Sequence, residues 1–550
     1  MDTISDLINE QCRRTPSAPA IVYGGQVTSY IELEELAARA ATGLARLGVG
    51  RGDRVAIWLP NTPAYLALWL GAARLGAIAV AVNTRFRGVE VADILARSGA
   101  RVLAMWPGFR SIAFLEILSE ADPSALARLE SIVLYGEGAQ HLEHPDALGH
   151  CRAISYDDLV DAPAYAHDAG ERALGCNIFT TSGTTKAPKF VLHSHGSVID
   201  HARTVAQAIG YATSTGGVLQ ALPLCGVFGF CQATAGLAAG RALLLMNTFE
   251  PDHALRLIDQ YQVEYLNGTD DMLTALFNAT EREIAMPSVK NCGFASFAAQ
   301  PETFMALASA RGLTLLGLYG MSEVQAFFSR QQVDALAKQR LLGGGYPLSR
   351  GATLRITDPA TGDELPLGQH GEIELRGPSL MSAYFEDPQA TAEAITADGY
   401  LRSGDLGYAT TDGGFVYLAR MGDVLRLGGF LVAPAEIEEH LNTHPLVTGA
   451  QVVGVNTERG VRPVGFVTLT TQATDQTTDQ ATDQATEQAR DQAQNEIVLR
   501  EHCLAGLAKF KAPDRILVVD KFPTAKSANG TKIQKARLRE MAVQAVAGAT

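Results

Sequence analysis

The stretch Phe179-Thr-Thr-Ser-Gly-Thr-Thr-Lys-Ala-Pro-Lys-Phe190 concentrates hydroxyl groups, a glycine and two lysines next to apolar segments. Small residues allow several backbone N–H groups to point at one anion, and the hydroxyls and lysines add donors and charge suited to phosphate. A polar loop between two strands would have a similar composition. The common P-loop does not match, because Pro188 stands where that motif has its second glycine and Phe190 follows the lysine. The stretch therefore predicts either a phosphate-binding nest or a polar loop, and residues elsewhere must decide between them.

Helix and strand patterns alternate on both sides of this stretch. Residues 30–47 carry apolar residues at helical spacing and stop at Gly48, where a helix-ending glycine belongs. Residues 54–59 and 77–82 are short apolar runs of strand type, and a helical pattern at 197–209 follows the opening stretch. Such alternation predicts an α/β fold in which helices cover mostly parallel sheets. Ligands of such folds bind at the carboxyl ends of the strands.

The chain length, 550 residues, exceeds what one hydrophobic core supports. Glycines crowd into residues 403–430, and the pattern beyond them is that of a small α+β domain. We predict a large N-terminal domain over residues 1–420 and a small, mobile C-terminal domain over residues 421–550, with a hinge near 421–423. Hairpin turns inside a single domain would produce a similar glycine pattern.

Residues 470–496 form a low-complexity insert, in which a four-residue unit recurs as Thr-Thr-Asp-Gln, Ala-Thr-Asp-Gln, Ala-Thr-Glu-Gln and Ala-Arg-Asp-Gln. In a helix the acidic residues of this repeat would lie four positions apart and repel one another. No apolar face compensates for that repulsion, so we predict a mobile surface loop.

The charge and the cysteines exclude several classes of protein. The net charge is −14 at pH 7, which disfavours a broad nucleic-acid interface. The 7 cysteines are scattered without a C-x-x-C pair, so neither a disulfide framework nor a zinc site is expected. Residues 66–82 are apolar but contain Arg74 and two glycines, and no signal-peptide pattern begins the chain. We therefore predict a cytoplasmic protein with no transmembrane segment.

Further clusters carry groups that suit a nucleotide. Tyr319-Gly-Met-Ser-Glu323 joins an aromatic ring, a hydroxyl and a carboxylate, and Ser403-Gly-Asp405 places a carboxylate on a tight turn, where it can hold two ribose hydroxyls. Arg420 opens a glycine-rich segment, and Asn529-Gly-Thr-Lys532 places a lysine on a turn before a basic helix. Each cluster has an ordinary alternative, such as a strand-end turn, an Asx-turn or a solvated surface lysine. Only their combination is informative.

Together and in this order, the clusters resemble those of the adenylate-forming superfamily, in the branch of acyl-CoA synthetases. The resemblance includes Leu222-Pro-Leu-Cys-Gly-Val-Phe-Gly229, Tyr400-Leu-Arg-Ser-Gly-Asp-Leu406 and Ala508-Lys-Phe-Lys-Ala-Pro513, and it covers nearly the whole chain. It implies a two-step ligase that uses ATP, Mg²⁺ and CoA. A carboxylate attacks the α-phosphate of ATP to give an acyl-adenylate and pyrophosphate, and a thiol then takes the acyl group. Positioning and charge stabilisation dominate such chemistry.

The resemblance assigns the opening stretch and the aromatic cluster to ATP. Tyr319 would pack on the adenine, and Glu323 would help to hold Mg²⁺, a hard cation suited to carboxylate and phosphate oxygens. Gly320 and Ser322 would belong to the same nucleotide-binding cluster. The phosphates would be held by Thr181, Ser182, Gly183, Thr184, Thr185 and Lys189.

The resemblance also assigns roles near the domain boundary and in the small domain. Asp405 would take the ribose hydroxyls, with Arg420 beside the ribose and phosphates. Lys532 matches the family's adenylation lysine, and since it lies in the small domain, that domain must swing away for the thiol step. The predicted catalytic residues are Lys532, Glu323 and Thr184. The loop that would face the pantetheine arm of CoA contains Gly428, Gly429 and Phe430.

The chain departs from the family pattern at several positions. Lys186 replaces a glycine of the nest, and Gly422 stands where the family has an Asp or Lys hinge residue. Gly226 replaces a histidine next to the acyl pocket, which should widen or deepen that pocket. The segment Phe294-Ala-Ser-Phe297 replaces a run of small residues near the adenine and the substrate. Each departure is also compatible with neutral drift.

By the same resemblance the acyl pocket is apolar. Its predicted walls include Gly226, Val227, Phe228, Phe294, Phe297, Gly317, Leu318 and Met321. No arginine is placed for a second carboxylate, so we expect an apolar monocarboxylic acid that is aromatic, alicyclic or medium-to-long aliphatic, and malonate-like diacids are disfavoured. An apolar pocket separates near homologues by only about 1–3 kcal/mol, so some breadth is expected.

Two alternatives to a CoA ligase stay open. The first is an enzyme that loads the acyl group onto a separate carrier protein, and the second is a nucleotide-binding homologue without activity. Retention of Glu323, Asp405, Arg420 and Lys532 argues against the second. The expected partners are a small carboxylic acid, ATP and CoA, with no nucleic acid, and a homodimer is compatible with the family.

Overall fold

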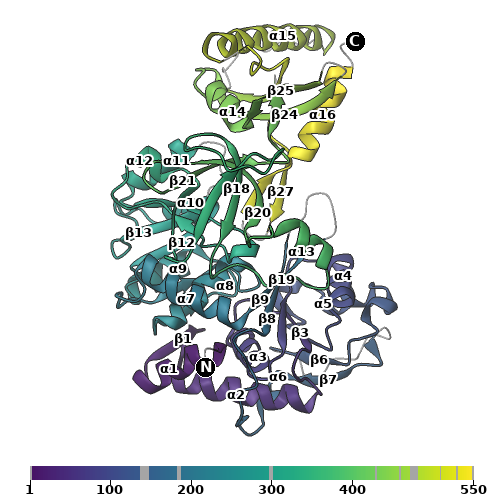
Figure 1. Ribbon diagram of the computed structural model, residues 1–550, viewed down its shortest axis with the longest axis vertical. Coiled ribbons are helices and arrows are strands. Elements are labelled where there is room, and N and C mark those ends of the chain that lie inside the picture. Colours follow the sequence, from purple (N-terminus) through teal and green to yellow (C-terminus); the bar gives the residue numbers. More distant parts are fainter. Residues whose placement is uncertain are drawn as a thin grey trace.

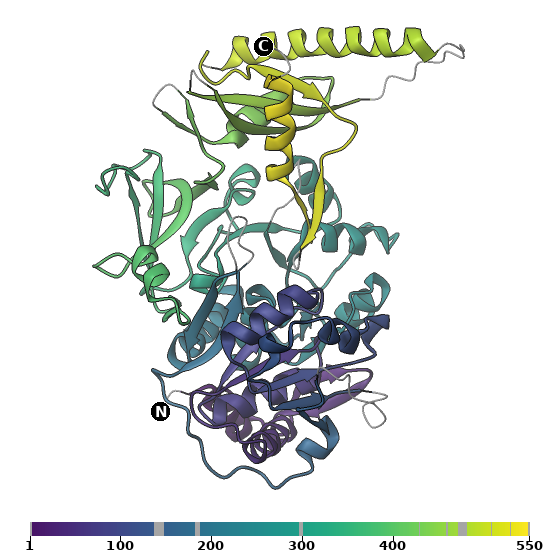
Figure 2. The same cartoon turned by 90° about the vertical axis from the view of Figure 1, so that its right-hand side faces the viewer.

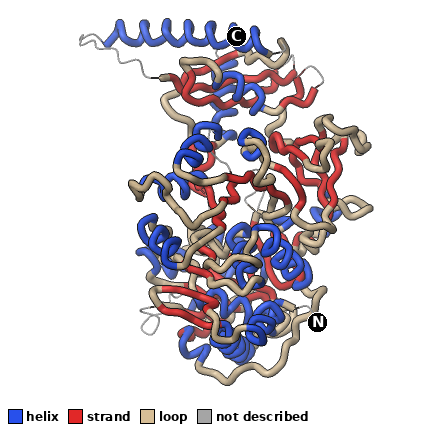
Figure 3. Tube along the Cα trace, turned by 90° about the vertical axis from the view of Figure 1, so that its left-hand side faces the viewer, coloured by secondary structure: helices blue, strands red, loops and turns tan. Residues whose placement is uncertain are grey.

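The computed structural model describes residues 3–136, 148–181, 188–295, 301–427, 430–457, 460–470, 481–507, 509–527 and 530–547. A large lobe contains the N-terminus, and a smaller lobe at one end of the long axis contains the C-terminus (Figure 1). From a second side, one long helix runs across the far end of the small lobe (Figure 2). In the large lobe, strands lie between layers of helices (Figure 3).

An eight-stranded sheet carries the opening stretch between two of its strands. Its order is β19 (Ala383–Tyr384), β9 (Phe190–Ser194), β8 (Gly175–Thr180), β4 (Ile78–Ala81), β3 (Arg54–Trp58), β5 (Val102–Met105), β6 (Ser131–Leu134) and β7 (Arg152–Ser155). The strands from β8 to β7 are parallel, whereas β9 pairs antiparallel with both β8 and β19. The opening stretch therefore connects the two strands of a hairpin, and its residues 182–187 lie outside the described ranges.

Helices cover both faces of this sheet, because its central strands are apolar on both sides. One face packs against α1 (Ile4–Arg14), α2 (Tyr30–Arg46), α3 (Pro63–Arg74), α6 (Tyr156–Val160), α7 (His195–Ile209) and α8 (Val227–Ala238), and the other against α4 (Gly88–Ser98) and α5 (Phe114–Ser119). The helices predicted at 30–47 and 197–209 are confirmed. α2 begins at a capping box, in which the side chains of Ser29 and Glu32 each accept a hydrogen bond from the other's backbone N–H.

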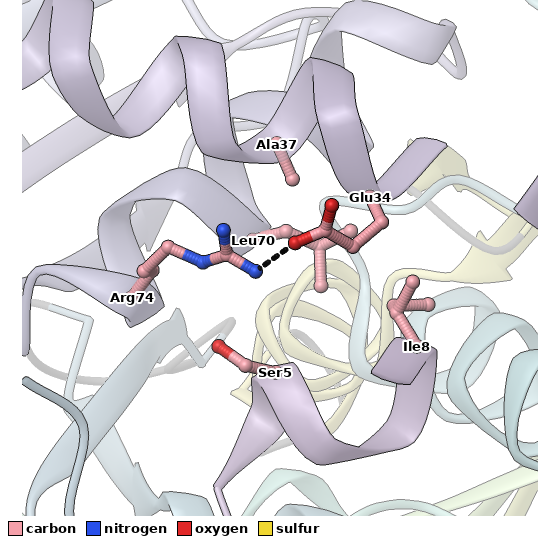
Figure 4. Close-up of a pocket in the computed structure, with 6 residues that line it drawn as sticks. All are labelled: Ser5, Ile8, Glu34, Ala37, Leu70 and Arg74. Carbon is pink, nitrogen blue, oxygen red and sulfur yellow. Dashed lines mark hydrogen bonds and ion pairs between the residues drawn. The ribbon is translucent and has the colours of Figure 1, made fainter. Parts of the chain in front are cut away.

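A partly buried ion pair joins α2 to α3. Nη2 of Arg74 lies 2.6 Å from Oε1 of Glu34, and the Arg74 side chain is only 9% exposed. A cavity of about 10 Å³, enough for about one water molecule, adjoins the pair. Figure 4 shows the pair together with the other residues around this cavity, Ser5, Ile8, Ala37 and Leu70.

The apolar residues 66–82 form the buried part of α3 followed by β4. Every described helix is either too short or too polar to cross a lipid bilayer.

A nine-stranded sheet carries the other predicted nucleotide-binding residues of the large lobe. Its order is β12 (Tyr265–Thr269), β13 (Asn291–Ala295), β14 (Leu315–Tyr319), β15 (Ser329–Arg330), β16 (Gly344–Pro347), β21 (Phe415–Arg420), β20 (Leu401–Ala409), β18 (Gly371–Arg376) and β17 (Thr353–Thr357). The predicted α/β class is confirmed. Parallel pairing prevails in the first sheet, but in this sheet only β12, β13 and β14 are parallel.

Smaller elements complete the large lobe. A four-stranded sheet has the order β10 (Val218–Gln220), β11 (Leu243–Leu245), β1 (Pro19–Tyr23) and β2 (Gln26–Ser29). An apolar core lies between β12 and β13 and the helices α9 (Pro251–Gln260), α10 (Asp270–Asn278) and α11 (Pro301–Ala310). The short helices α12 (Ala337–Arg340) and α13 (Pro388–Ala394) lie near the second sheet.

The small lobe has apolar cores of its own. Its elements are β22 (Leu425–Leu427), β23 (Phe430–Val432), α14 (Pro434–Asn442), β24 (Val447–Thr457), β25 (Gly460–Leu469), α15 (Ala481–Gly506), β26 (Arg515–Val518), β27 (Thr524–Ser527), β28 (Gly530–Ile533) and α16 (Lys535–Ala547). β21 ends at Arg420 and β22 begins at Leu425, so the predicted boundary falls between elements of the two lobes. Movement about residues 421–423 stays a prediction.

The prediction of a mobile surface loop over residues 470–496 is wrong where the chain forms α15. Residues 471–480 lie outside the described ranges. Farther along α15, Leu499 and Cys503 are fully buried against the core of the small lobe. Once this part of the helix is anchored, each preceding residue only extends it and bears no nucleation cost. The Ala and Gln residues of the repeat favour helix, which offsets a repulsion of a few tenths of a kcal/mol for each like-charge pair.

Candidate active site

The predicted nucleotide-binding residues of the second sheet lie on neighbouring elements. Tyr319 ends β14, and a 3₁₀ turn over Ser322–Val324 follows, which contains Glu323. Asp405 on β20 lies directly opposite Arg420 on β21 in the antiparallel register. The sheet thus brings together groups that lie far apart in the sequence.

Asp405 is the centre of the first group of contacts. The Tyr319 hydroxyl donates to Oδ2 of Asp405 at 2.7 Å, and Nε of Arg420 lies 3.1 Å from Oδ1. Burial raises the pKa of Asp405 to about 6, while the charge of Arg420 and the hydrogen bond from Tyr319 lower it. Burial also raises the pKa of the Tyr319 phenol, so this group remains a donor at neutral pH. Asp405 therefore presents two fixed acceptor oxygens beside a cation.

Aromatic rings surround Tyr319. Its ring centroid lies 5.1 Å from that of Phe415 in an edge-to-face arrangement and 5.6 Å from that of Tyr417. Both neighbours belong to β21, the strand that also carries Arg420. A planar ligand beside Tyr319 would meet an aromatic wall next to the acceptor oxygens of Asp405.

Glu323 is the centre of the second group of contacts. Its carboxylate is buried, and the hydroxyl of Tyr384 donates to Oε1 at 2.8 Å. Tyr384 lies on β19, which pairs with β9 just after the opening stretch. The ammonium of Lys189 lies 4.4 Å from the ring centroid of Tyr384, within the range of a cation–π contact. One tyrosine thus connects the carboxylate turn to the opening stretch.

The two described ends of the opening stretch are pinned together. The backbone N–H of Thr181 donates to the Lys189 carbonyl oxygen at 3.0 Å, and the backbone N–H of Lys189 donates to the Thr181 hydroxyl at 3.1 Å. These bonds close the hairpin mouth at which Thr181 and Lys189 lie. The predicted phosphate-binding residues between them, Ser182, Gly183, Thr184 and Thr185, and also Lys186, lie outside the described ranges.

Two other parts of the predicted site are described only in part. Gly428 and Gly429 lie outside the described ranges, and Phe430 is described only as a backbone position in β23. Lys532 is likewise described as a backbone position in β28, paired with Ala525 of β27. β28 lies against α10, so the hairpin that carries Lys532 extends from the small lobe to the large one.

The predicted acyl-pocket residues lie on two sides of the second sheet. Phe294 and Gly317 are opposite each other on neighbouring strands, and Phe294 is 1% exposed in the core against Phe304 of α11. Leu318 faces the other side, because a Cβ built on Gly293 would lie 3.0 Å from its Cδ1. The structure therefore separates Phe294 and Gly317 from Leu318. Phe297 lies outside the described ranges.

The Leu318 side of the sheet faces α8. Gly226 caps the N-terminus of α8, followed by Val227 and Phe228, and the Phe228 ring lies 5.0 Å from that of Phe327. Met321 directly precedes the 3₁₀ turn that contains Glu323 and packs against the apolar cluster to which Tyr319 belongs.

Sequence reasoning missed the polar residues on this side. Asn267 of β12 donates through Nδ2 to the Tyr211 hydroxyl at 3.0 Å and to Oε1 of Gln232, on α8, at 3.1 Å. Sequence reasoning also missed Tyr384, which donates to Glu323. No local motif marks these residues, because their partners are distant in the sequence and only the fold brings them together.

The described residues contain no cluster of three or more side chains able to hold a metal ion by themselves. Glu323 nevertheless fits Mg²⁺, because it is a buried carboxylate held by a neutral donor, Tyr384, which leaves its charge in place. Mg²⁺ commonly binds one or two carboxylates and takes its other oxygens from water and substrate phosphates. A single carboxylate beside a phosphate site is sufficient for such a cation.

Comparison with known proteins agrees with this arrangement. The family model "AMP-binding enzyme" matches residues 8–385, and the model "AMP-binding enzyme C-terminal domain" matches residues 436–529. A 4-coumarate–CoA ligase of Oryza sativa subsp. japonica is 30% identical over 82% of this chain and 80% of its own length. The mitochondrial medium-chain acyl-CoA ligase ACSF2 of Mus musculus is 26% identical over 98% of this chain and 88% of its own.

A solved structure has the same fold over nearly the whole chain. ATP-bound MatB from Rhodopseudomonas palustris superposes with a TM-score of 0.78 at 25% identity and covers 98% of each chain. The chain therefore belongs to the AMP-binding enzyme family of the adenylate-forming superfamily, and it is an AMP-forming acid–thiol ligase.

Proposed function

We propose that the protein is an ATP-dependent carboxylate–CoA ligase that activates an apolar monocarboxylic acid as an acyl-adenylate and transfers the acyl group to CoA. The main support is the convergence of Glu323, Tyr384 and Lys189 at the mouth of the hairpin that contains the opening stretch. Such an arrangement suits a triphosphate, whose oxygens would meet backbone donors, a lysine and a carboxylate-bound cation together.

The nucleoside would occupy the groups around Asp405. Tyr319, within its aromatic surroundings, would pack against the adenine, and the two oxygens of Asp405 would accept from the ribose hydroxyls. Arg420 would hold Asp405 in place and face the ribose and phosphates. Gly320 and Ser322 would shape the turn beside the nucleotide, and Thr181 to Thr185 with Lys189 would hold the phosphates.

Mg²⁺ would be held by Glu323 and the phosphate oxygens, and when bound it would neutralise charge on the phosphates. Tyr384 would fix the rotamer of Glu323 without reducing its charge, because a phenol is an uncharged donor. Thr184 and Lys532 complete the proposed catalytic group. Lys532 would approach on the hairpin that lies against α10 and meet the acid and the α-phosphate.

The acid would lie on the α8 side of the second sheet. Val227, Phe228, Leu318 and Met321 would supply apolar contacts, and the absence of a side chain at Gly226 would leave room at the start of α8. The relatives named for 4-coumarate and for medium-chain acyl groups support an aromatic or aliphatic acid of this kind. Gly428, Gly429 and Phe430 would face the pantetheine of CoA after the small lobe moves. We further propose a cytoplasmic location.

An assay with purified protein tests this function. Pyrophosphate release is followed with ATP, Mg²⁺ and a panel of cinnamic, benzoic, alicyclic, medium-chain and long-chain acids, each with and without CoA, with malonate as the diacid control. We expect acid-dependent pyrophosphate, thioester formation and little activity on malonate. Pyrophosphate without thioester would instead support loading of a carrier protein. No release with any acid would favour a nucleotide-binding protein without activity.

A further inference from the structure

Two histidines from different elements contact the turn that carries Glu323. Nε2 of His193, on β9, lies 2.8 Å from the Ser322 carbonyl oxygen, and Nε2 of His201, on α7, lies 2.8 Å from the Gln325 carbonyl oxygen. A carbonyl oxygen can only accept, so each ring donates through Nε2–H. Glu323 lies between the two carbonyls that these rings hold.

Both rings are uncharged at neutral pH. His193 is fully buried and His201 is 4% exposed, and this burial lowers the pKa of each ring to about 4. Among the residues that the structure describes, Nδ1 of His193 has no hydrogen-bond partner, which matches a neutral ring whose proton is on Nε2. The rings therefore hold the turn without adding positive charge, which would compete with a cation beside Glu323.

The turn itself is strained. Gln325 and Ala326 both have φ near +59°, a left-handed conformation that costs roughly 1–2 kcal/mol for each residue other than glycine. The turn is also tight, since a Cβ built on Gly320 would lie 1.6 Å from the Ala326 carbonyl oxygen. Such a conformation persists only where surrounding contacts hold it.

Contacts from two directions hold this turn. On one side, the Met381 N–H donates to the Glu323 carbonyl oxygen at 2.7 Å, and Gln325 Nε2 donates to the Ser379 carbonyl oxygen at 3.3 Å. On the other side are the two histidines. Without their donors, the carbonyls of Ser322 and Gln325 would lose buried partners, and the strained turn would be free to relax.

We propose that His193 and His201 are positioning residues, which fix the Glu323 carboxylate where it holds the nucleotide-bound cation. This role rests on the proposed function, because it takes Glu323 as the Mg²⁺ ligand. Neither ring is proposed to touch the substrate. Their effect passes through the two backbone carbonyls that flank Glu323. Loss of either donor should therefore lower the free energy of cation binding by more than it lowers the free energy of unfolding.

The test uses Mn²⁺ as a paramagnetic probe with α,β-methylene-ATP, an analogue that cannot donate its adenylyl group because the bridge between its α- and β-phosphorus atoms is not cleaved. The dissociation constant of Mn²⁺ from the ternary complex is measured by electron paramagnetic resonance of free Mn²⁺, and thermal unfolding of each protein is followed in parallel. At each histidine three replacements are compared: Leu has no donor, Asn has its amide at the position of Nδ1, and Gln has its amide near the position of Nε2.

We expect His193→Leu, His193→Asn, His201→Leu and His201→Asn to weaken Mn²⁺ binding at least fivefold, and the two Gln variants to stay within about twofold of the wild type. Where a Leu variant does not fold, comparison of the Asn and Gln variants still tests the proposal. Both side chains are polar, but only the Gln amide reaches the position of Nε2. The matched control is His195→Asn. Nδ1 of His195 accepts from the Ile4 N–H at 3.2 Å, so this ring holds α1 and its loss should leave Mn²⁺ affinity unchanged.

Equal Mn²⁺ affinity in all folded variants would overturn the positioning role, and so would Gln variants as weak as the Leu variants. If Glu323→Gln binds Mn²⁺ in the ternary complex as tightly as the wild type, the metal assignment of Glu323 fails, and the positioning role fails with it. The Glu323→Gln measurement thus separates failure of the metal assignment in the proposed function from failure of the inference.

Discussion

At the scale of single residues, phenols hold both carboxylates of the candidate site. Tyr319 donates to Asp405, and Tyr384 donates to Glu323. A phenol fixes the direction of a carboxylate and leaves its negative charge intact, whereas a lysine or arginine partner would neutralise it. Asp405 has a cation nearby in Arg420, which suits ribose hydroxyls, and the described hydrogen bond of Glu323 comes from a neutral group, which suits a metal ion.

Replacement of Tyr384 tests this role of the phenol. Tyr384→Phe removes the donor to Glu323 and keeps the ring beside Lys189. A hydrogen bond to a charged group contributes about 1.5–3 kcal/mol, so we expect pyrophosphate release to fall roughly 10- to 100-fold and more Mg²⁺ to be needed for half-maximal rate. Initial rates across a Mg²⁺ titration measure both quantities.

Tyr346→Phe is the matched control for this change. The Tyr346 hydroxyl also donates to a carboxylate, that of Asp412, but the pair is exposed and lies outside the candidate site. We expect its rate and Mg²⁺ dependence to equal those of the wild type. Equal losses in the two variants would contradict a specific role for Tyr384.

The pKa of Asp405 predicts a pH dependence of nucleoside binding. Its value of about 6 means that the carboxyl is protonated below that pH and then offers fewer acceptor sites. We expect adenosine affinity to rise as pH increases through about 6, and Asp405→Asn to bind weakly at every pH. Adenosine is the suitable probe because it has no phosphate that titrates in this range, and ligand-observed NMR measures its binding.

The same carboxyl group affects stability with the opposite trend. Its folded-state pKa is above the ordinary value of 3.8, so the folded protein binds this proton more readily than the unfolded chain does. Its contribution to stability is therefore present at acidic pH and is lost as pH rises through about 6.

Adenosine affinity that does not change between pH 5 and 7 would contradict the assignment of Asp405 to the ribose.

At the scale of elements, the ion pair between Arg74 of α3 and Glu34 of α2 forms only because the two helices pack against each other. Arg74 is 9% exposed and Glu34 is 26% exposed. Figure 4 shows their two side chains pointing toward each other. Loss of one partner leaves the other charge without compensation, and the cost is larger for the more buried charge. The two single substitutions should therefore differ in their effect.

We expect Glu34→Gln to lower the free energy of unfolding by about 3 kcal/mol, because Arg74 stays buried without its carboxylate. Arg74→Gln should cost less, since Glu34 reaches solvent. Urea titrations measure both changes. The control is Glu35→Gln, which breaks the exposed pair with Arg39 on the same helix and should cost less than about 1 kcal/mol. A larger loss for Arg74→Gln than for Glu34→Gln would contradict this interpretation.

At the scale of the whole molecule, a hairpin from the small lobe lies against the large one. β28, which carries Lys532, packs against α10. If Lys532 acts in adenylation, Lys532→Ala should lower acid-dependent pyrophosphate release by roughly 100-fold or more, because charge stabilisation at the α-phosphate would be lost. The same variant should still transfer the acyl group from supplied acyl-adenylate to CoA at nearly the wild-type rate.

Lys535 provides the control, because it lies just beyond this hairpin and its Nζ is 3.5 Å from Oε1 of Glu438 within the small lobe. Lys535→Gln should leave the ratio of the two half-reactions unchanged. Single-turnover measurements of adenylate and thioester formation give that ratio. Equal loss of both steps in Lys532→Ala would show that Lys532 acts elsewhere than in adenylation.

The sequence by itself predicted the α/β class, the helices at 30–47 and 197–209, and the family. These features depend on residues close together in the chain, where apolar spacing, a capping box and short motifs act through local backbone geometry. Where a local rule failed, as in α15, the reason was not local. Repulsion between the acidic residues of the repeat disfavoured a helix, and the helix forms because the neighbouring residues are anchored against the core of the small lobe.

Only the tertiary structure decided how the site is held together. The donors to Glu323 and its turn come from β19, β9 and α7, and no spacing along the chain relates Tyr384, His193 or His201 to that carboxylate. The same holds for Phe294, whose face on β13 depends on the register of the sheet. A hydrogen bond requires two groups within about 3 Å, and for groups so far apart in sequence the packing of strands and helices alone sets that distance.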